Sequence, residues 1–253
     1  MFPAMIVLFA VIASLIYFYF FIWQTRWAAR RILESVRKNF TQDRDICVIS
    51  SEALPRDTAE KYAEAREVVE GLGFKFICYA EDETFTRSNG IMIPFQYFRD
   101  EKGEVKAVTY YHPKIGYVIY EFMTELSDGR ELMTSNALMA AKIMAPPIFV
   151  RNYLPVNALP SDMLKTHREQ LGKILGGTRG ITCSTAMTPE EILERYRHDN
   201  RAKYKFHRDR GWISLEELIR LSPKGSEATA RRVYAMIQKI LREEDSSARR
   251  SPQ

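Results

Sequence analysis

The first 23 residues contain no charged side chain, and this run constrains the fold more than any other feature of the chain. A helix of ~20 apolar residues matches the ~30 Å hydrocarbon layer of a bilayer. A cleavable signal peptide needs a basic start and small residues before its cleavage site. In this chain, bulky aromatic residues occupy the positions before a possible cleavage site, which argues against a signal peptide. A buried helix of a globular core is the other alternative, but such helices rarely run so far without a charge. The sequence therefore predicts an uncleaved transmembrane anchor over residues 1–23.

Basic residues follow this anchor and predict its orientation. Residues 24–40 hold five basic residues and one acidic residue, and such a flank stays in the cytoplasm. We therefore expect a single-pass protein of the cell membrane, with its N-terminus outside and its main domain cytoplasmic. Three cysteines without a CxxC pair agree with a reducing compartment. The candidate membrane-interface residues are two aromatic and three basic ones, namely Tyr19, Trp23, Arg26, Arg30 and Arg31. The alternative is that these basic residues serve only as a stop-transfer flank, which would carry the same charges.

Residues 24–44 read as a basic juxtamembrane helix and linker, and residues 45–135 as an α+β domain. Asp57 and Glu60 have the spacing of a capping box, which starts a helix over residues 57–72. Alternating apolar residues separated by turn residues then predict an antiparallel β-meander, packed by that helix. The predicted strands are residues 46–50, 74–80, 91–98, 105–112, 115–126 and 130–135.

Three details of this sheet follow from single residues. Asn89-Gly90 and Asp128-Gly129 are pairs that accept the positive φ of tight hairpins. Pro94 has no amide hydrogen, so its strand is expected at a sheet edge or a bulge. Glu121 and Glu125 alternate with apolar residues, which predicts one buried face and one solvent-exposed face.

Residues 136–245 predict a helical C-terminal region, and residues 246–253 a disordered polar tail. Thr188-Pro189 is a favourable helix start, and Ser214 with Glu217 has capping-box spacing. The predicted helices are residues 137–147, 161–177, 188–206, 214–221 and 226–245. The expected fold class is thus α+β: one N-terminal transmembrane helix, a β-meander packed by a helix, and a helical C-terminal region.

Charge is distributed unevenly along the chain, and this distribution indicates which classes of partner can bind. The net charge of +5 is the sum of +4 over residues 24–40, −6 over residues 41–150 and +7 over residues 151–253. An acidic sheet domain argues against nucleic acid as a partner, because phosphate contacts need a positive surface. The basic segment 195–212 interleaves aromatics with seven basic residues, and is a candidate surface for an acidic protein or anionic lipid. These residues are Arg195, Arg197, Arg201, Lys203, Lys205, Arg208 and Arg210. A merely solvated helix is the competing interpretation.

Candidate chemistry is sparse. Cys183 precedes a predicted helix start, where a thiolate would be stabilised, and His167 or His198 would be its base. An isolated loop cysteine is more often a passive thiol, so Cys183 is a weak catalytic candidate. No histidine pair has metal-ligand spacing, and the acidic run at residues 81–83 is better explained as a charged loop. No phosphate-binding or cofactor-binding motif is present, so no metal or cofactor is expected.

These observations leave several functions open. The favoured hypothesis is a non-enzymatic, membrane-anchored interaction protein, such as an accessory subunit that binds a protein partner in the membrane or at its cytoplasmic face. The alternative is a membrane-tethered domain that binds a small ligand or a lipid, because a curved sheet closed by a helix can enclose a pocket. A hydrolase or transferase using Cys183 is a third hypothesis.

Overall fold

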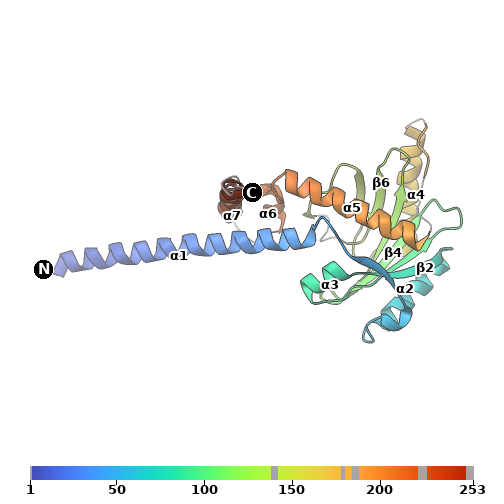
Figure 1. The fold of residues 1–253 in the computed structure, drawn as a ribbon, viewed down its shortest axis with the longest axis horizontal. Helices are drawn as coiled ribbons and strands as arrows, with labels where there is room; N and C mark the ends of the chain where they lie inside the picture. The colour runs from blue at the N-terminus through green and yellow to red at the C-terminus, as the bar shows by residue number, and fades with distance from the viewer. Residues whose placement is uncertain (1, 138–141, 178–179, 184–187, 222–226, 249–253) are drawn as a thin grey trace. The chain divides into compact units, whose positions relative to one another are not determined.

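The computed structural model describes residues 2–137, 142–177, 180–183, 188–221 and 227–248 (Figure 1). For residues 2–10 and residue 248 it describes only the backbone. The chain divides into two compact units. The sheet unit is Thr41–Phe206, and the helical unit combines Met1–Phe40 with His207–Gln253.

The sheet unit holds a seven-stranded sheet whose spatial order follows the order of the strands in the chain. Neighbouring strands are antiparallel except for the last pair, β6 and β7, which is parallel. The α+β class and the meander predicted from the sequence are therefore confirmed. The strands are β1 (Ile46–Ile49), β2 (Lys75–Asp82), β3 (Phe95–Arg99), β4 (Lys106–His112), β5 (Tyr117–Glu125), β6 (Glu131–Ser135) and β7 (Phe149–Tyr153).

Helices cover both faces of this sheet. Helices α2 (Ala59–Gly71) and α4 (Pro160–Gly177) pack on one face, where Val69 and Met163 join Phe98 and Phe122 in a buried core. Helix α5 (Pro189–Asp209) packs on the other face and runs across the sheet in Figure 1. A short 3-10 helix (Ser51–Ala53) and α3 (Glu83–Asn89) complete the unit.

The prediction of a solvent-exposed sheet face is wrong. Ile192 of α5 is buried in a cluster with Tyr97 and Val108, which lie on the face that should have been wet. As a result, Glu125 on that face is buried. The strand pattern shows that the two faces differ in polarity, but it cannot show that a helix from far along the chain will cover the polar one.

Two further predictions, one about a turn and one about the place of a strand, are also corrected. Asn89-Gly90 ends helix α3 instead of closing a hairpin, and Gly90 takes the left-handed conformation (φ 67°) of a helix C-cap. Pro94 precedes its strand: β3 begins at Phe95 and is not an edge strand, and the register shift of the β2–β3 pair lies between Phe76 and Cys78 of β2, not at Pro94. The Pro94 carbonyl accepts a hydrogen bond from the Tyr62 hydroxyl (2.9 Å).

The sheet unit also extends beyond residue 135, where the sequence places the start of a helical region. Strand β7 pairs with β6 residue by residue from Glu131↔Phe149 to Ser135↔Tyr153, and α4 packs against β5 and β6. The helix predicted over residues 137–147 lies partly outside the described residues, since 138–141 are not described; residues 142–147 form no α-helix. A five-residue strand flanked by prolines gives little periodicity to recognise.

The helical unit consists of α1 (Phe2–Asn39), α6 (Leu215–Leu221) and α7 (Glu227–Ala248). Helix α1 packs against α7, with Leu33 buried on α1 and Ile237 buried on α7. Because α7 continues to Ala248, the predicted disordered tail is wrong for residues 246–248. Residues 249–253 lie outside the described residues.

Among the helices of the described residues, none combines the length and the apolar character that a membrane crossing requires. The anchor predicted over residues 1–23 falls partly outside that description, which omits residue 1 and the side chains of residues 2–10.

Candidate functional site

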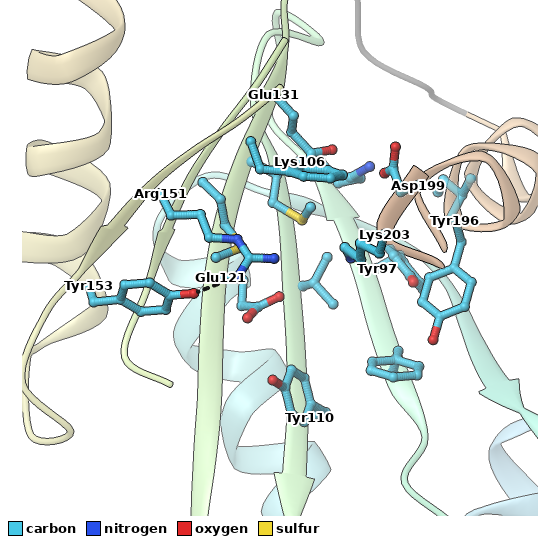
Figure 2. Close-up of a pocket in the computed structure, with 16 residues that line it drawn as sticks. Tyr97, Lys106, Tyr110, Glu121, Glu131, Arg151, Tyr153, Tyr196, Asp199 and Lys203 are labelled. Carbon is cyan, nitrogen blue, oxygen red and sulfur yellow. Dashed lines mark hydrogen bonds between the residues drawn. The ribbon is translucent and has the colours of Figure 1, made fainter. Parts of the chain in front are cut away.

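A cavity of about 240 Å³ lies between the sheet and α5 (Figure 2). Strands β3 to β7 form its floor and α5 forms its roof. Because side chains alternate along a strand, every second residue of each floor strand faces the cavity. The lining residues are Phe95, Tyr97, Lys106, Val108, Tyr110, Glu121, Met123, Glu131, Met133, Phe149, Arg151, Tyr153, Ile192, Tyr196, Asp199 and Lys203.

The strand register places the floor residues in rows across the sheet. Met123 of β5 stands opposite Lys106 of β4 and opposite Met133 of β6, and Met133 stands beside Arg151 of β7. Directly opposite residues have Cβ atoms about 4.5–5.5 Å apart, so each row is a continuous surface. This row therefore has a cation at either end and two methionines between them.

Four charged groups beside the cavity form contacts with one another. The Lys106 ammonium donates to Glu125 Oε1 (3.3 Å). Arg195 of α5 lies between Asp199 Oδ1 (3.0 Å from Nε) and Glu125 Oε2 (3.5 Å from Nη1). These ion pairs are largely shielded from water, where breaking a pair costs far more than at the surface.

Two cations that line the cavity have no such partner. Arg151 Nη1 donates to the Tyr153 hydroxyl (3.2 Å), while its buried Nε has no hydrogen-bond partner in the part of the chain that the structure describes. Lys203 Nζ lies 5.1 Å from the centre of the Phe149 ring. Within the described part of the chain, no carboxylate oxygen lies within 4 Å of either side chain. Burial lowers the pKa of Lys203; the nearby charge of Asp199 opposes this effect, and the charge of Arg151 adds to it.

Two carboxyl groups of the cavity have raised pKa values. Glu131 is 2% exposed; its Oε2 lies 4.0 Å from Arg195 Nε and has no hydrogen-bond partner among the described residues. Burial, followed by the nearby charge of Asp199, raises the pKa of Glu131 to about 7. Burial also raises the pKa of Glu121, which accepts a hydrogen bond from Ser135 Oγ (3.0 Å). The cavity thus contains polar groups that the protein itself does not fully satisfy.

The structure separates the seven residues of the predicted anionic-partner surface. Arg195 and Lys203 face the sheet, as described above. Arg197 donates to the Ile46 carbonyl (3.1 Å), and Arg201 pairs with Glu194 (2.7 Å). Lys205 is exposed, Arg208 pairs with Asp209 (3.0 Å), and Arg210 pairs with the buried Glu217 (2.6 Å). These cations are largely engaged within the protein, because one helix presents both a packed face and a solvated one.

The predicted membrane-interface residues lie on α1. Tyr19, Trp23, Arg30 and Arg31 are exposed, and the Arg31 guanidinium lies over the Trp27 ring at 5.0 Å. Arg26 differs from them, since it pairs with Glu243 of α7 (2.9 Å).

The structure does not bring Cys183 together with either histidine that was expected to act as its base. Burial raises the pKa of the Cys183 thiol, which opposes formation of a thiolate. His167 is buried between the hydroxyls of Thr124 (2.9 Å) and Thr134 (3.1 Å), and His198 lies beside Asp199. In the described residues neither histidine hydrogen-bonds to Cys183. Over the same ranges, no three His, Cys, Asp or Glu side chains are arranged to hold a metal ion.

A concave site with both polar and apolar lining, such as this cavity between a sheet and a covering helix, is typical of small-molecule sites in proteins generally. Comparison with protein families, with characterised proteins and with solved structures finds no match to this chain. The site must therefore be interpreted from its own geometry.

Sequence reasoning missed most of this site. Of the cavity's cations it singled out only Lys203, and for a different role. Lys106, Glu131 and Arg151 were missed because they lie on strands far apart in the sequence. The available signal was a charged residue at an inward position of an otherwise apolar strand, as for Lys106 in residues 105–112.

Proposed function

We propose that this protein is a membrane-tethered binding protein for a small polar ligand, which occupies the cavity between the sheet and α5. The observation that carries the proposal is the set of incompletely satisfied polar groups around a cavity of about 240 Å³. A buried polar atom without a partner is costly, and a ligand that hydrogen-bonds to it removes that cost. Two methionines and several aromatic rings would contact the ligand's apolar part.

The tether is supported by the sequence of residues 1–23 and by the exposed side chains that follow residue 10. Leu15, Ile16 and Phe18 are each more than 60% exposed. Four further aromatic residues of this stretch are also exposed: Tyr17, Tyr19, Phe20 and Trp23. Contiguous apolar surface of this kind is rare on soluble monomers and typical of surfaces that meet lipid or another protein. The basic flank supports a cytoplasmic sheet unit. The same surface favours a second candidate, an accessory subunit that contacts a partner protein within the membrane.

The tether makes a direct prediction for cell fractionation. The full chain should sediment with membranes, resist extraction by alkaline carbonate and dissolve in mild detergent, because ~20 buried apolar residues hold it in the bilayer. A chain lacking residues 1–23 should remain in the supernatant, whereas a chain lacking residues 249–253 should behave as the full chain does. Release of the full chain by carbonate alone would contradict the anchor.

The cavity makes a prediction for ligand binding, measured as the unfolding temperature of the full chain in mild detergent. The probe set contains small carboxylates, phosphates, amines, sugars and neutral amides. At least one probe should stabilise the wild type, by about 2.7 kcal/mol when its concentration is 100 times its Kd. Val108→Phe should abolish that stabilisation, because Val108 is on the cavity floor and the larger ring fills the space.

The control for this experiment is Val48→Phe, since Val48 is a 47% exposed strand valine that does not line the cavity. It should bind as the wild type does. Met123→Phe, at a second position on the floor, serves as the test if Val108→Phe fails to fold. The proposal is contradicted if no probe stabilises the wild type, or if Val108→Phe and Met123→Phe bind as tightly as Val48→Phe.

A further inference from the structure

We propose that the ligand of this cavity carries an oxyanion, a carboxylate or phosphate group, which binds between Arg151 and Lys203. This inference rests on the proposed function and adds the chemical class of the ligand.

The two cations reach the cavity from opposite sides. Arg151 is on strand β7 of the floor, and Lys203 is on α5 of the roof. Figure 2 shows both charged ends directed into the space between the sheet and the helix. Neither lies within 4 Å of a carboxylate oxygen in the described residues. A single anionic group in that space would contact both.

The protein's own carboxylates attract the two cations without contacting them. Glu125 and Asp199 already contact Lys106 and Arg195. Glu121 accepts a hydrogen bond from Ser135 on the β6 side. Asp199, Glu131 and Glu121 attract Lys203, but among the described residues no carboxylate oxygen lies within 4 Å of Lys203 or Arg151. An anion in direct contact with both cations would therefore add a short-range attraction that the protein's own carboxylates do not supply.

The remaining chemistry of the cavity also suits an anion. Arginine presents a fork of N–H donors that matches carboxylate and phosphate oxygens, and the buried Nε of Arg151 is unused. The Tyr153 hydroxyl accepts from Arg151, so its own hydrogen is free to point at a ligand oxygen. Burial raises the pKa of Glu131 to about 7, so this carboxyl is partly protonated near neutral pH and repels an anion less than a full carboxylate would. Met123, Met133 and Phe149 supply apolar contacts for the ligand's body.

The test is isothermal titration of the full chain in mild detergent with three probes: inorganic phosphate, benzoate and benzamide. Benzamide has the shape of benzoate without its charge, so the pair isolates the oxyanion. Wild type should bind benzoate or phosphate at least tenfold more tightly than benzamide. A preference for phosphate over benzoate, or the reverse, identifies which oxyanion the site takes.

Substitutions of the two cations test whether the anion binds between them. Lys203→Met and Arg151→Gln, which remove the charge but keep an unbranched aliphatic stem, should each weaken binding of the preferred anion at least tenfold. Lys205→Met removes an exposed lysine of the same helix and should bind as the wild type does. Lys203→Arg keeps the charge and should retain most of the affinity. Circular dichroism of every variant checks that it is folded.

The possible failures are distinguishable. If Lys203→Met and Arg151→Gln bind the anion as tightly as Lys205→Met, this inference is wrong. If benzamide or another uncharged probe binds, the anions do not, and Val108→Phe abolishes that binding, the proposed function stands and the oxyanion is wrong. If no probe binds in the cavity, both proposals fail.

Discussion

Replacing Asp82 with alanine is expected to lower the free energy of unfolding of the sheet unit by about 3–5 kcal/mol. Asp82 ends strand β2, is 2% exposed and pairs with Arg44, whose side chain is 7% exposed. Its carboxylate also accepts hydrogen bonds from the Tyr196 hydroxyl (2.7 Å) and from the Phe85 amide (2.9 Å), which caps α3. The alanine variant removes the carboxylate that pairs with the buried Arg44 charge and accepts these two hydrogen bonds, and the loss of that charge pair is the main cost.

Urea unfolding followed by circular dichroism, with hydrogen exchange of amides in β2 to β4, measures this loss. Tryptophan fluorescence is unsuitable, since Trp23, Trp27 and Trp212 all belong to the helical unit. Asp45→Ala is the matched control: Asp45 pairs with Arg87, but the two side chains are 69% and 61% exposed. An exposed pair contributes about 0–1 kcal/mol. A loss for Asp82→Ala within 1 kcal/mol of the control would overturn the prediction.

The second large effect is expected in the helical unit, where Glu217→Ala should cost about 3–5 kcal/mol. Glu217 is fully buried and pairs with Arg210 (2.6 Å). It also completes a capping box at the start of α6, where its carboxylate accepts from the Ser214 amide (2.7 Å) and its amide donates to Ser214 Oγ (3.2 Å). Removing the carboxylate breaks the pair and the cap together.

Fluorescence of Trp212 reports this change, because Trp212 is buried while Trp23 and Trp27 are exposed. The urea midpoint of that signal should fall in Glu217→Ala and stay unchanged in Glu216→Ala, which alters the exposed neighbouring carboxylate. Equal midpoints in the two variants would show that the buried pair and cap do not stabilise the unit.

Local signals in the sequence were sufficient for most helices and strands. The capping box of Ser214 and Glu217 is confirmed, and six strands lie where alternation and turn residues predict them. Strand β7 was missed because its partner, β6, is joined to it by a long connection and lies parallel to it. Helix α3 was missed because seven residues rich in polar side chains carry no apolar period.

The candidate site was less predictable than the fold. Lys203 was expected on an anionic-partner surface, whereas the structure places it over the sheet among Asp199, Glu121 and Arg151. Whether a basic residue on an amphipathic helix is solvated or enclosed depends on which surface that helix covers. No pattern within residues 188–206 contains that information, because the covered surface is made of strands 50 to 100 residues earlier.

The sequence alone determined the strand alternation, the helix caps at Thr188 and Ser214, the uncharged N-terminal run and the unequal division of charge along the chain; the capping box it predicts at Asp57 is not formed. Each of these depends on a few neighbouring residues, and local chemistry is enough to define it. Only the tertiary structure decided that α5 covers the second sheet face, that Arg195 and Lys203 point inward, and that Lys106, Glu131 and Arg151 meet them around one cavity. Contacts between residues far apart in sequence set burial, and burial gives those charged groups their unusual chemistry.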